Sequence, residues 1–343
     1  MRRRAIAALV FVATLGLAAT GVSDEPGRTP REHRRPPDQT YLTFPEWFLV
    51  HSPNELARYT ADHSPSGFPF LGHVGQLWSS YGSVTEATSQ YDLNVGYHVM
   101  ILVIASSTTV EYGIRAGYET LVGRLAEATQ TGPTTAEETF AAQVAQEYVD
   151  FINEQPWYAF DFVDALERLW TEVPLIGPDM IRKVERRYAL TTELVAKASY
   201  GWLIGIGTAA SYEAPLLVTA VVLEREPDAV PEGVDLEVLE RFDDGQVLAT
   251  LPRYEAFGVQ ASILAEAGAR FVEIAGNRGP IVISAIVPAG TSREVADDVL
   301  FVQPILTRPT EERVVFQVPV ADLADALNRL GTPDRQLEHV YDF

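Results

Sequence analysis

The chain has 343 residues, room for about two domains, and its 47% hydrophobic content is that of a folded protein. The formal net charge of -21 argues against nucleic acid as a partner, because phosphate binding requires clustered lysine and arginine. The absence of cysteine excludes disulfides, thiolate metal sites, iron–sulfur clusters and a cysteine nucleophile.

The N-terminus has the residue order of a secretory signal. Arginines at positions 2–4 precede an apolar run over 5–19, and small residues follow up to Gly21. We therefore expect residues 1–22 to form a signal peptide cleaved near Gly21 or, alternatively, an uncleaved N-terminal anchor. Residues 23–40 are rich in proline and arginine and lack apolar periodicity, which predicts a disordered linker.

Two apolar stretches, near 95–112 and near 199–222, stand out in the first two thirds of the chain. Each is nearly long enough to cross a bilayer, so membrane helices are expected at both places. They belong to a helical, aromatic-rich module that we assign to residues 41–223. The end of the second stretch, 216–223, is rich in valine and leucine after a proline and could equally be a buried β-strand.

The distribution of cations predicts an orientation in the membrane. Seven cations follow the first stretch or precede the second: Arg115, Arg124, Arg182, Lys183, Arg186, Arg187 and Lys197. Under the positive-inside rule they place residues 114–198 in the cytoplasm. The C-terminal part would then lie outside the cytoplasmic membrane of a bacterium. A soluble exported protein whose two apolar helices are buried is the alternative.

Capping signals predict further helices in this module. Ser52, followed by a proline, predicts a helix that begins there and covers 54–61. Thr135, with a glutamate three residues later, is a predicted N-cap, and the apolar periodicity of 134–172 indicates two helices. A third helix is expected to begin near Pro178 and to run into the second apolar stretch.

From residue 231 the pattern changes to short strands and helices. Asp243-Asp244-Gly245 lies between two strand-like runs, which predicts a β-hairpin. The expected strands are 235–242, 246–251, 271–275, 281–287, 300–306, 314–318 and 337–341, and the expected helices are 254–267 and 321–330. This order predicts a ferredoxin-like α+β sandwich over 231–343. The predicted fold class is α+β, with an N-terminal helical membrane-associated module before this sandwich.

Several short motifs resemble those of a known family. They are Tyr41-Leu42-Thr43-Phe44-Pro45-Glu46-Trp47, Ser66-Gly67-Phe68-Pro69, Gly96-Tyr97-His98-Val99-Met100, Arg270-Phe271-Val272-Glu273-Ile274-Ala275-Gly276-Asn277 and Glu338-His339-Val340-Tyr341-Asp342-Phe343. With them the chain resembles an uncharacterised family of bacterial membrane proteins over most of its length past residue 40. The resemblance implies a membrane location, and it implies neither an activity nor any functional residue.

Two groups of ionisable residues are candidates for chemistry. His98 and Glu111 lie within or at the end of the first apolar stretch, where an ionisable group points to function if the helix spans a membrane. Thirteen residues separate them, about 220° around a helix, so they could not chelate one metal ion unaided.

The second group lies in the aromatic region before the first stretch. His51, His63 and His73, together with Glu46 and Asp62, could form a metal or acid–base site. Their spacing matches no metal-binding helix motif, so the sequence names no particular metal or cofactor.

The leading functional prediction is a membrane-anchored protein that binds or assembles a membrane lipid or a membrane protein partner. The chain has no nucleophile elbow, P-loop or dinucleotide-binding glycine motif. One alternative is an enzyme that acts on a lipid-like substrate at the membrane surface through His/Glu acid–base or metal chemistry. The other is the soluble exported protein.

Overall fold

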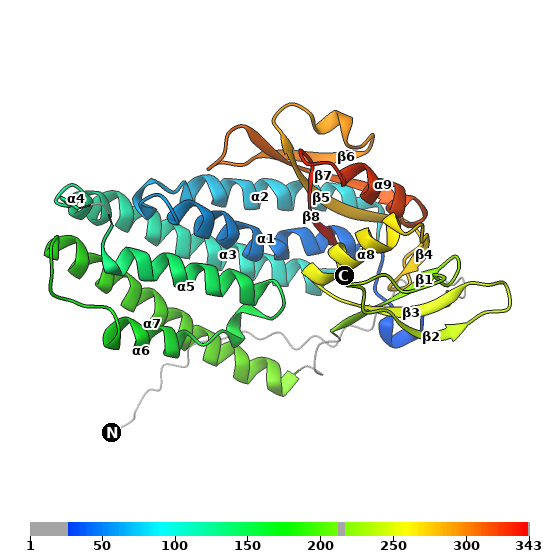
Figure 1. Cartoon of the computed structure of the whole chain (residues 1–343), viewed down its shortest axis with the longest axis horizontal. Coiled ribbons are helices and arrows are strands. Elements are labelled where there is room, and N and C mark those ends of the chain that lie inside the picture. The colour runs from blue at the N-terminus through cyan, green and yellow to red at the C-terminus, as the bar shows by residue number, and fades with distance from the viewer. Residues whose placement is uncertain (1–26, 133, 212–216, 342–343) are drawn as a thin grey trace, which may run out of the picture.

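The computed structural model describes residues 27–132, 134–211 and 217–341, without the side chains of 205–211 (Figure 1). A helical region comes first in the chain and a strand-rich domain follows, so the predicted α+β class is confirmed. The predicted signal segment lies outside the described residues.

The helical region is built from long helices that pack side by side (Figure 1). Its described α-helices are α1 (Gln39–Thr60), α2 (Phe70–Ala87), α3 (Val95–Tyr118), α4 (Arg124–Glu127), α5 (Ala136–Ile152), α6 (Phe162–Thr171) and α7 (Met180–Ser211). A π-helical turn, Glu119–Gly123, joins α3 to α4 without a break. At the start of α5 the predicted cap is confirmed, because Thr135 and Glu138 form a capping box.

Helix α1 begins much earlier than the sequence predicted. It continues through Pro45 and Pro53, so Ser52 is inside the helix and does not cap it. Proline usually ends or kinks a helix, since it removes a backbone hydrogen bond. Here packing outweighs that local preference, because thirteen of the residues of α1, Tyr41 and Phe44 among them, are buried against other elements.

The second apolar stretch is divided between two elements. Helix α7 ends at Ser211, and β1 (Val218–Leu223) is a buried strand, so the prediction of one membrane helix near 199–222 is wrong over its last residues. Residues 212–216 lie outside the described part. Within the described chain, only Val95–Glu127 is long and apolar enough to cross a membrane, by length and composition alone.

The strand-rich domain contains two antiparallel sheets of four described strands each. Its elements are β1, β2 (Glu237–Arg241), β3 (Val247–Pro252), α8 (Glu255–Glu266), β4 (Phe271–Ile274), β5 (Pro280–Pro288), β6 (Val299–Pro304), β7 (Glu311–Pro319), α9 (Leu323–Leu330) and β8 (Gln336–Tyr341). Sheet A has the order β2-β3-β1-β4 and sheet B has the order β6-β7-β5-β8. The predicted β2–β3 hairpin is confirmed, with Gly245 at a φ of 90° in its turn.

The two sheets repeat one topology. Each is formed by three strands, a helix and a fourth strand in sequence, and the strand orders are identical when β1–β4 are matched to β5–β8. The irregularities of pairing match as well. The ladder skips Val272 on β4 and Glu338 on β8, and it skips Leu239 on β2 and Leu300 on β6. The domain therefore contains a structural repeat, which the sequence analysis did not detect.

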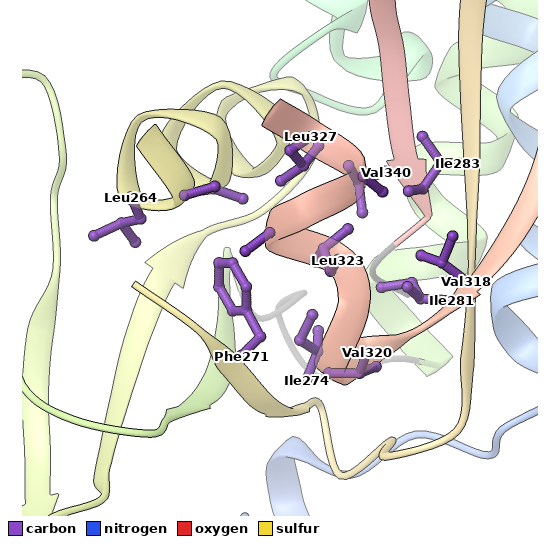
Figure 2. Close-up of a cluster of buried hydrophobic side chains, with 14 of the residues drawn as sticks. Leu264, Phe271, Ile274, Ile281, Ile283, Val318, Val320, Leu323, Leu327 and Val340 are labelled. Carbon is purple, nitrogen blue, oxygen red and sulfur yellow. The ribbon is translucent and has the colours of Figure 1, made fainter. Parts of the chain in front are cut away.

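The two halves share one hydrophobic core. Helices α8 and α9 pack against each other, and apolar side chains from both sheets surround them (Figure 2). Phe271 and Ile274 come from sheet A, whereas Ile283 and Val340 come from sheet B. A ferredoxin-like sandwich would place its strands in a single sheet. The described strands form two, so that finer prediction is not confirmed.

Residues 27–38 are placed against sheet A and do not form the disordered linker predicted for 23–40. Thr29 is buried, and its N–H donates to Glu273 Oε1 at 2.9 Å. The Arg28 guanidinium pairs with Asp244 at 2.6 Å, and the Arg35 N–H donates to the Ala275 carbonyl. The prediction failed here because this segment is held by backbone hydrogen bonds and by an ion pair. Apolar periodicity in the sequence does not reveal such interactions.

The cations at the start of α7 are also placed differently from the prediction. Arg182, Lys183, Arg186 and Arg187 are buried, and each pairs with a glutamate. The partners are Glu119, Glu137, Glu138 and Glu185. These four positive and four negative groups neutralise one another inside the fold. They therefore carry no information about orientation in a membrane.

Thr40 joins the helical region to sheet B. Its hydroxyl donates to the Tyr341 carbonyl at 2.7 Å and accepts from the Val282 N–H at 3.0 Å. Both residues are buried and face each other at the end of the β5–β8 ladder, and the Thr40 hydroxyl is a hydrogen-bond partner of both backbone groups. A single hydroxyl of α1 thus completes the hydrogen bonding of the C-terminal sheet.

We predict that Thr40→Val lowers the free energy of unfolding by about 1–3 kcal/mol, because it leaves two buried backbone groups without this partner. Thr60→Val is the matched control, since the Thr60 hydroxyl only donates to carbonyls of its own helix. Urea denaturation of both variants measures the difference. Equal stability of the two variants would show that the Thr40 bridge is dispensable.

Candidate functional site

Helix α1 covers one face of sheet B, and a buried polar network lies between them. The opposite face of the sheet contacts α8 and α9. Tyr41, Phe44 and Trp47 of α1 form an apolar cluster with Val282, Val315 and Tyr341 of the sheet. The polar network continues from this cluster along α1, and its members are Ser52, Glu55, His51, His73, Ser284, Arg313, Glu338, His339 and Tyr341.

Arg313 is the charged centre of the network. It is 1% exposed, and its guanidinium lies 2.9 Å from Glu55 on α1 and 2.6 Å from Glu338 on β8. Burial alone would raise the pKa of the Glu338 carboxyl. The charge of Arg313 and its hydrogen bond to Glu338 outweigh burial and lower that pKa to about 2. Glu338 is therefore ionised at neutral pH.

The β-bulge on β8 directs two adjacent side chains into the network. Strand residues normally alternate between the two faces of a sheet. Because the ladder skips Glu338, both Glu338 and His339 lie on the α1 side, whereas Leu337 and Val340 contact the core on the other side. Bulges often redirect side chains beside functional sites. The equivalent bulge residue in the first half of the domain, Val272, has an uncharged side chain.

His51 connects Glu338 to a pair of hydroxyl groups. Its Nδ1 lies 3.6 Å from Glu338 Oε1, and its Nε2 is 3.0 Å from the Tyr341 hydroxyl, which in turn is 3.0 Å from Ser284 Oγ. Burial lowers the pKa of His51 to about 4, although the Glu338 charge opposes this shift. The imidazole is thus neutral at pH 7.

His73 forms a second branch on the α2 side of α1. Its Nδ1 is 3.0 Å from Ser52 Oγ, which also lies 2.7 Å from the Tyr112 hydroxyl. Its Nε2 is 3.6 Å from Glu55 Oε2, beyond hydrogen-bond distance. Burial, followed by the charge of Arg313, lowers the pKa of His73 to about 3. Neither histidine is charged at neutral pH.

His339 is buried without a hydrogen-bond partner. It is 2% exposed, and neither of its ring nitrogens has a partner in the described structure. The ring stacks on Trp47 with centroids 3.6 Å apart, and Tyr341 packs edge-on against it at 4.9 Å. Burial lowers the pKa of His339 well below its usual value. The imidazole is therefore neutral and rigidly held.

A pocket of about 290 Å³ opens between α8 and the free edge of β8. It is lined by Glu255, Gly258, Val259, Ser262, Ile263, Leu337, Glu338 and His339. β8 is an edge strand of sheet B, and α8 lies alongside it. A Cβ at Gly258 would contact Leu337 and Val340. Two residues of the network, Glu338 and His339, are among those that line it.

The structure separates the histidines and carboxylates that the sequence grouped together. His51 and His73 belong to the network, but His63 is exposed and stacks on Tyr59. Glu46 accepts a hydrogen bond from the Tyr97 hydroxyl at 2.6 Å, away from the histidines. Among the described residues, no group of three or more histidine, aspartate or glutamate side chains could hold a metal ion.

The two candidates on α3 have ordinary polar partners. His98 Nδ1 is 2.9 Å from the Tyr81 hydroxyl on α2. Glu111 is exposed and lies near Arg115 and Lys197, at 3.6 and 3.9 Å. These two cations pair more closely with Glu193 of α7, so Glu111 is part of a charge ladder between α3 and α7.

Sequence reasoning missed the central members of the network. Arg313, Glu338 and His339 lie in strands more than 200 residues from α1, and no local spacing connects them to it. The only sequence signal was the terminal motif containing Glu338 and His339, which was noted for resemblance and not for chemistry.

A second feature is the exposed apolar face of α3 and its continuation into α4. Along one side lie Val95, Val99, Val103, Val110, Ile114, Leu121 and Leu125, with exposures from 44 to 72%. Their spacing follows an 11-residue repeat of four, four and three, interrupted by Ser106 and Gly117. This period keeps the residues from Val95 to Ile114 in a nearly straight line along the α-helix, and Leu121 and Leu125 follow within and after the π-helical turn. We call this line the α3 stripe.

The opposite side of α3 is buried. Ile101, Ala105, Thr108 and Tyr112 face inward, and α1 and α2 are its main neighbours there. In the most apolar 18-residue window of the helix only 22% of residues are buried. Exposed apolar and aromatic side chains also occur on α6 and α7, including Trp170, Tyr188 and Trp202. Apolar surface of this extent on a folded chain marks a contact surface.

Comparison with protein-family models, with curated proteins and with solved structures finds no match.

The buried histidines predict a loss of stability in mild acid. Their pKa values in the folded chain, about 4 for His51 and about 3 for His73, lie below the ordinary value of 6.5. The unfolded chain therefore binds protons first, so stability is complete above pH 6.5 and falls as the pH drops toward 4. A shift of this size corresponds to about 3 kcal/mol for His51.

We expect His51→Gln to reduce this pH dependence, as measured by urea denaturation between pH 7 and pH 4. His63→Gln is the control, because His63 is exposed and outside the network, and it should keep the parental profile. Identical profiles for all three proteins would mean that His51 does not resist protonation.

Arg313→Met should be strongly destabilising, by about 3–5 kcal/mol, because it leaves two buried carboxylates without their cation. The control is Arg241→Met, which removes the exposed ion pair with Glu226 and should change the free energy of unfolding very little. Thermal or urea denaturation measures both variants. A small effect at Arg313 would show that Glu55 and Glu338 are solvated or protonated in the folded protein.

Proposed function

We propose that the protein is a membrane-associated binding protein whose helical region rests on the lipid surface through the α3 stripe. The strand-rich domain would lie in water, where its pocket is accessible. The observation that carries this proposal is the exposure of the α3 stripe over nearly the whole length of an apolar helix. From Val95 to Leu125 the stripe is about 45 Å long, at 1.5 Å per residue.

The packing of α3 favours a position in the plane of the membrane over one that crosses it. Its inner side is packed against α1 and α2, which carry exposed polar groups such as Arg58 and Glu86. A spanning α3 would bring these neighbours into the hydrocarbon layer, where ionised groups are costly. A helix that lies in the interface buries only one face in lipid, and that is the face left exposed here.

Lipid is also the occupant that the rest of the chain favours. The predicted signal or anchor at residues 1–22 would deliver the chain to the outer surface of a bacterial cytoplasmic membrane. Exposed tryptophan and tyrosine side chains, such as Trp202 and Tyr188, are typical of the lipid–water interface. The net charge of -21 favours zwitterionic over anionic lipid.

The absence of cysteine allows a direct test with the full-length protein. We predict that a polarity-sensitive dye on Ile114→Cys shifts to the blue when phosphatidylcholine vesicles are added, because Ile114 lies on the stripe and is 68% exposed. The same dye on Glu232→Cys, an exposed position in the strand-rich domain, should not shift.

The paired positions separate contact through the stripe from attachment through the N-terminus alone. Binding of vesicles without a shift at position 114 would overturn the proposal. Such a result would indicate that the α3 stripe contacts a protein partner and not lipid.

A further inference from the structure

We propose that one proton, bound to Glu55 and donated to His73, locks the helical region onto sheet B, and that its loss as the pH rises loosens this joint. The inference is independent of the membrane proposal, because it concerns a buried contact and not the exposed face of α3. Glu55 belongs to α1 and His73 to α2, and both side chains are buried. The proton is therefore held between two helices that each contact sheet B.

Two buried atoms without hydrogen-bond partners in the described structure face each other at this place. They are Glu55 Oε2 and His73 Nε2, which lie 3.6 Å apart. The other end of each group is occupied, because Glu55 Oε1 accepts from Arg313 at 2.9 Å and His73 Nδ1 lies 3.0 Å from Ser52 Oγ. Buried polar atoms are normally paired, and a hydrogen atom between these two pairs both of them after a slight approach of the side chains.

The charges of the network indicate that this hydrogen is an additional proton. Arg313 supplies one positive charge for two acidic side chains, Glu55 and Glu338. Glu338 binds Arg313 with both of its oxygens, at 2.6 and 2.7 Å, so the guanidinium charge is already compensated. An ionised Glu55 would leave a negative charge in excess inside the fold, which is costly. A proton on Glu55 removes that excess.

The hydrogen bonds around His73 are consistent with a proton on Glu55. A neutral imidazole that accepts at Nε2 carries its own hydrogen on Nδ1. His73 Nδ1 then donates to Ser52 Oγ, and the Ser52 hydroxyl can donate to the Tyr112 hydroxyl on α3 at 2.7 Å. The proton on Glu55 thus sets the direction of a row of hydrogen bonds that joins three helices.

The surroundings of Glu55 favour its protonated form. Burial has the largest effect and raises the pKa of Glu55, and the charge of Glu338 acts in the same direction. The charges of Arg313 and Arg308 oppose this shift without cancelling it. The titratable and charged groups that face Glu55 come from all the elements packed around it: His51 on α1, His73 on α2, Tyr112 on α3 beyond Ser52, Arg308 in the β6–β7 turn, Arg313 on β7 and Glu338 on β8.

The raised pKa gives the stability a definite dependence on pH. The folded chain keeps the proton of Glu55 to a higher pH than the unfolded chain, whose ordinary value is 4.5. The contribution of Glu55 is therefore complete below pH 4.5 and is lost as the pH rises through its pKa in the folded protein. His51 and His73 act in the opposite direction below pH 6.5, so a matched variant is needed to isolate Glu55.

Glu55→Gln is that variant, because it mimics the protonated acid. Its amide oxygen can accept from Arg313 while its N–H donates to His73. Thermal denaturation of the full-length protein should show Glu55→Gln at least as stable as the parent at pH 7, with an advantage in Tm that grows from pH 5 to pH 9. Glu338→Gln, which removes the ionised partner of Arg313, should lower the Tm by about 10 °C at pH 7. Equal destabilisation by the two variants would overturn the proposal, since Glu55 would then be an ionised partner as well.

Infrared spectroscopy detects the proton directly. In heavy water at pH 7, the parent should show the C=O stretch of a protonated carboxylic acid. The difference spectrum between the parent and Glu55→Gln should contain this band, whereas the difference with Glu86→Gln, at an exposed position of α2, should not. Absence of the band from the parent would overturn the proposal whether or not the variants fold.

Hydrogen exchange tests whether the proton holds the joint. At pH 9 the amides of α1 and β8 should exchange faster in the parent than in Glu55→Gln, because only the parent can ionise at this position. The amides of α6, which packs on α5 and α7, should exchange equally in both proteins. Comparison at a single pH removes the direct effect of pH on exchange. Equal exchange of α1 and β8 in the two proteins would overturn the proposed lock.

Discussion

The buried guanidinium of Arg313 determines how the two parts of the chain fit together. It binds one carboxylate from α1 and one from β8, so the ion pairs form only when the helix lies correctly on sheet B. A buried charge without its partners is strongly destabilising, whereas a complete set compensates its own desolvation. Small displacements of α1 are therefore disfavoured. His51 occupies a defined position for the same reason, since it extends from the same helix into the network, and His73 joins the network from α2 through Ser52 of α1.

One topology occurs twice in the strand-rich domain, in two sheets with different coverings. In sheet A, the N-terminal segment that includes Thr29 binds at β4 through Glu273. In sheet B, α1 covers the corresponding face, and its Trp47 stacks on His339. The shared bulge gives both halves a strand position whose side chain departs from simple alternation. In the second half, that position holds Glu338 and lies at the rim of the pocket.

The sequence predicted local structure well wherever a local signal was sufficient. The strands and helices of the C-terminal domain followed from alternation and from the Asp243-Asp244-Gly245 turn, and α5 followed from the Thr135 cap. Prediction failed where contacts between residues distant in the sequence determine the secondary structure. The apolar run at β1 could not be told from a helix by composition, and it is buried because both β3 and β4 pair with it.

The candidate site was predictable only in part, for a similar physical reason. His51 and His73 were identified as unusual, but their partners Glu338 and Arg313 are separated from them by more than 200 residues. The periodicity of hydrophobic residues in a sequence does not reveal a buried ion pair between a helix and a distant strand. The bulge at Glu338 was equally hidden, because a strand with one extra residue has almost the same composition as a regular one.

The unpaired nitrogens of His339 carry a cost in the stability of the protein. A phenylalanine would stack on Trp47 equally well, and it would avoid the cost of burying two polar atoms without partners. The imidazole therefore lowers the free energy of unfolding relative to a phenylalanine at this position, although its stacking on Trp47 is retained in either case.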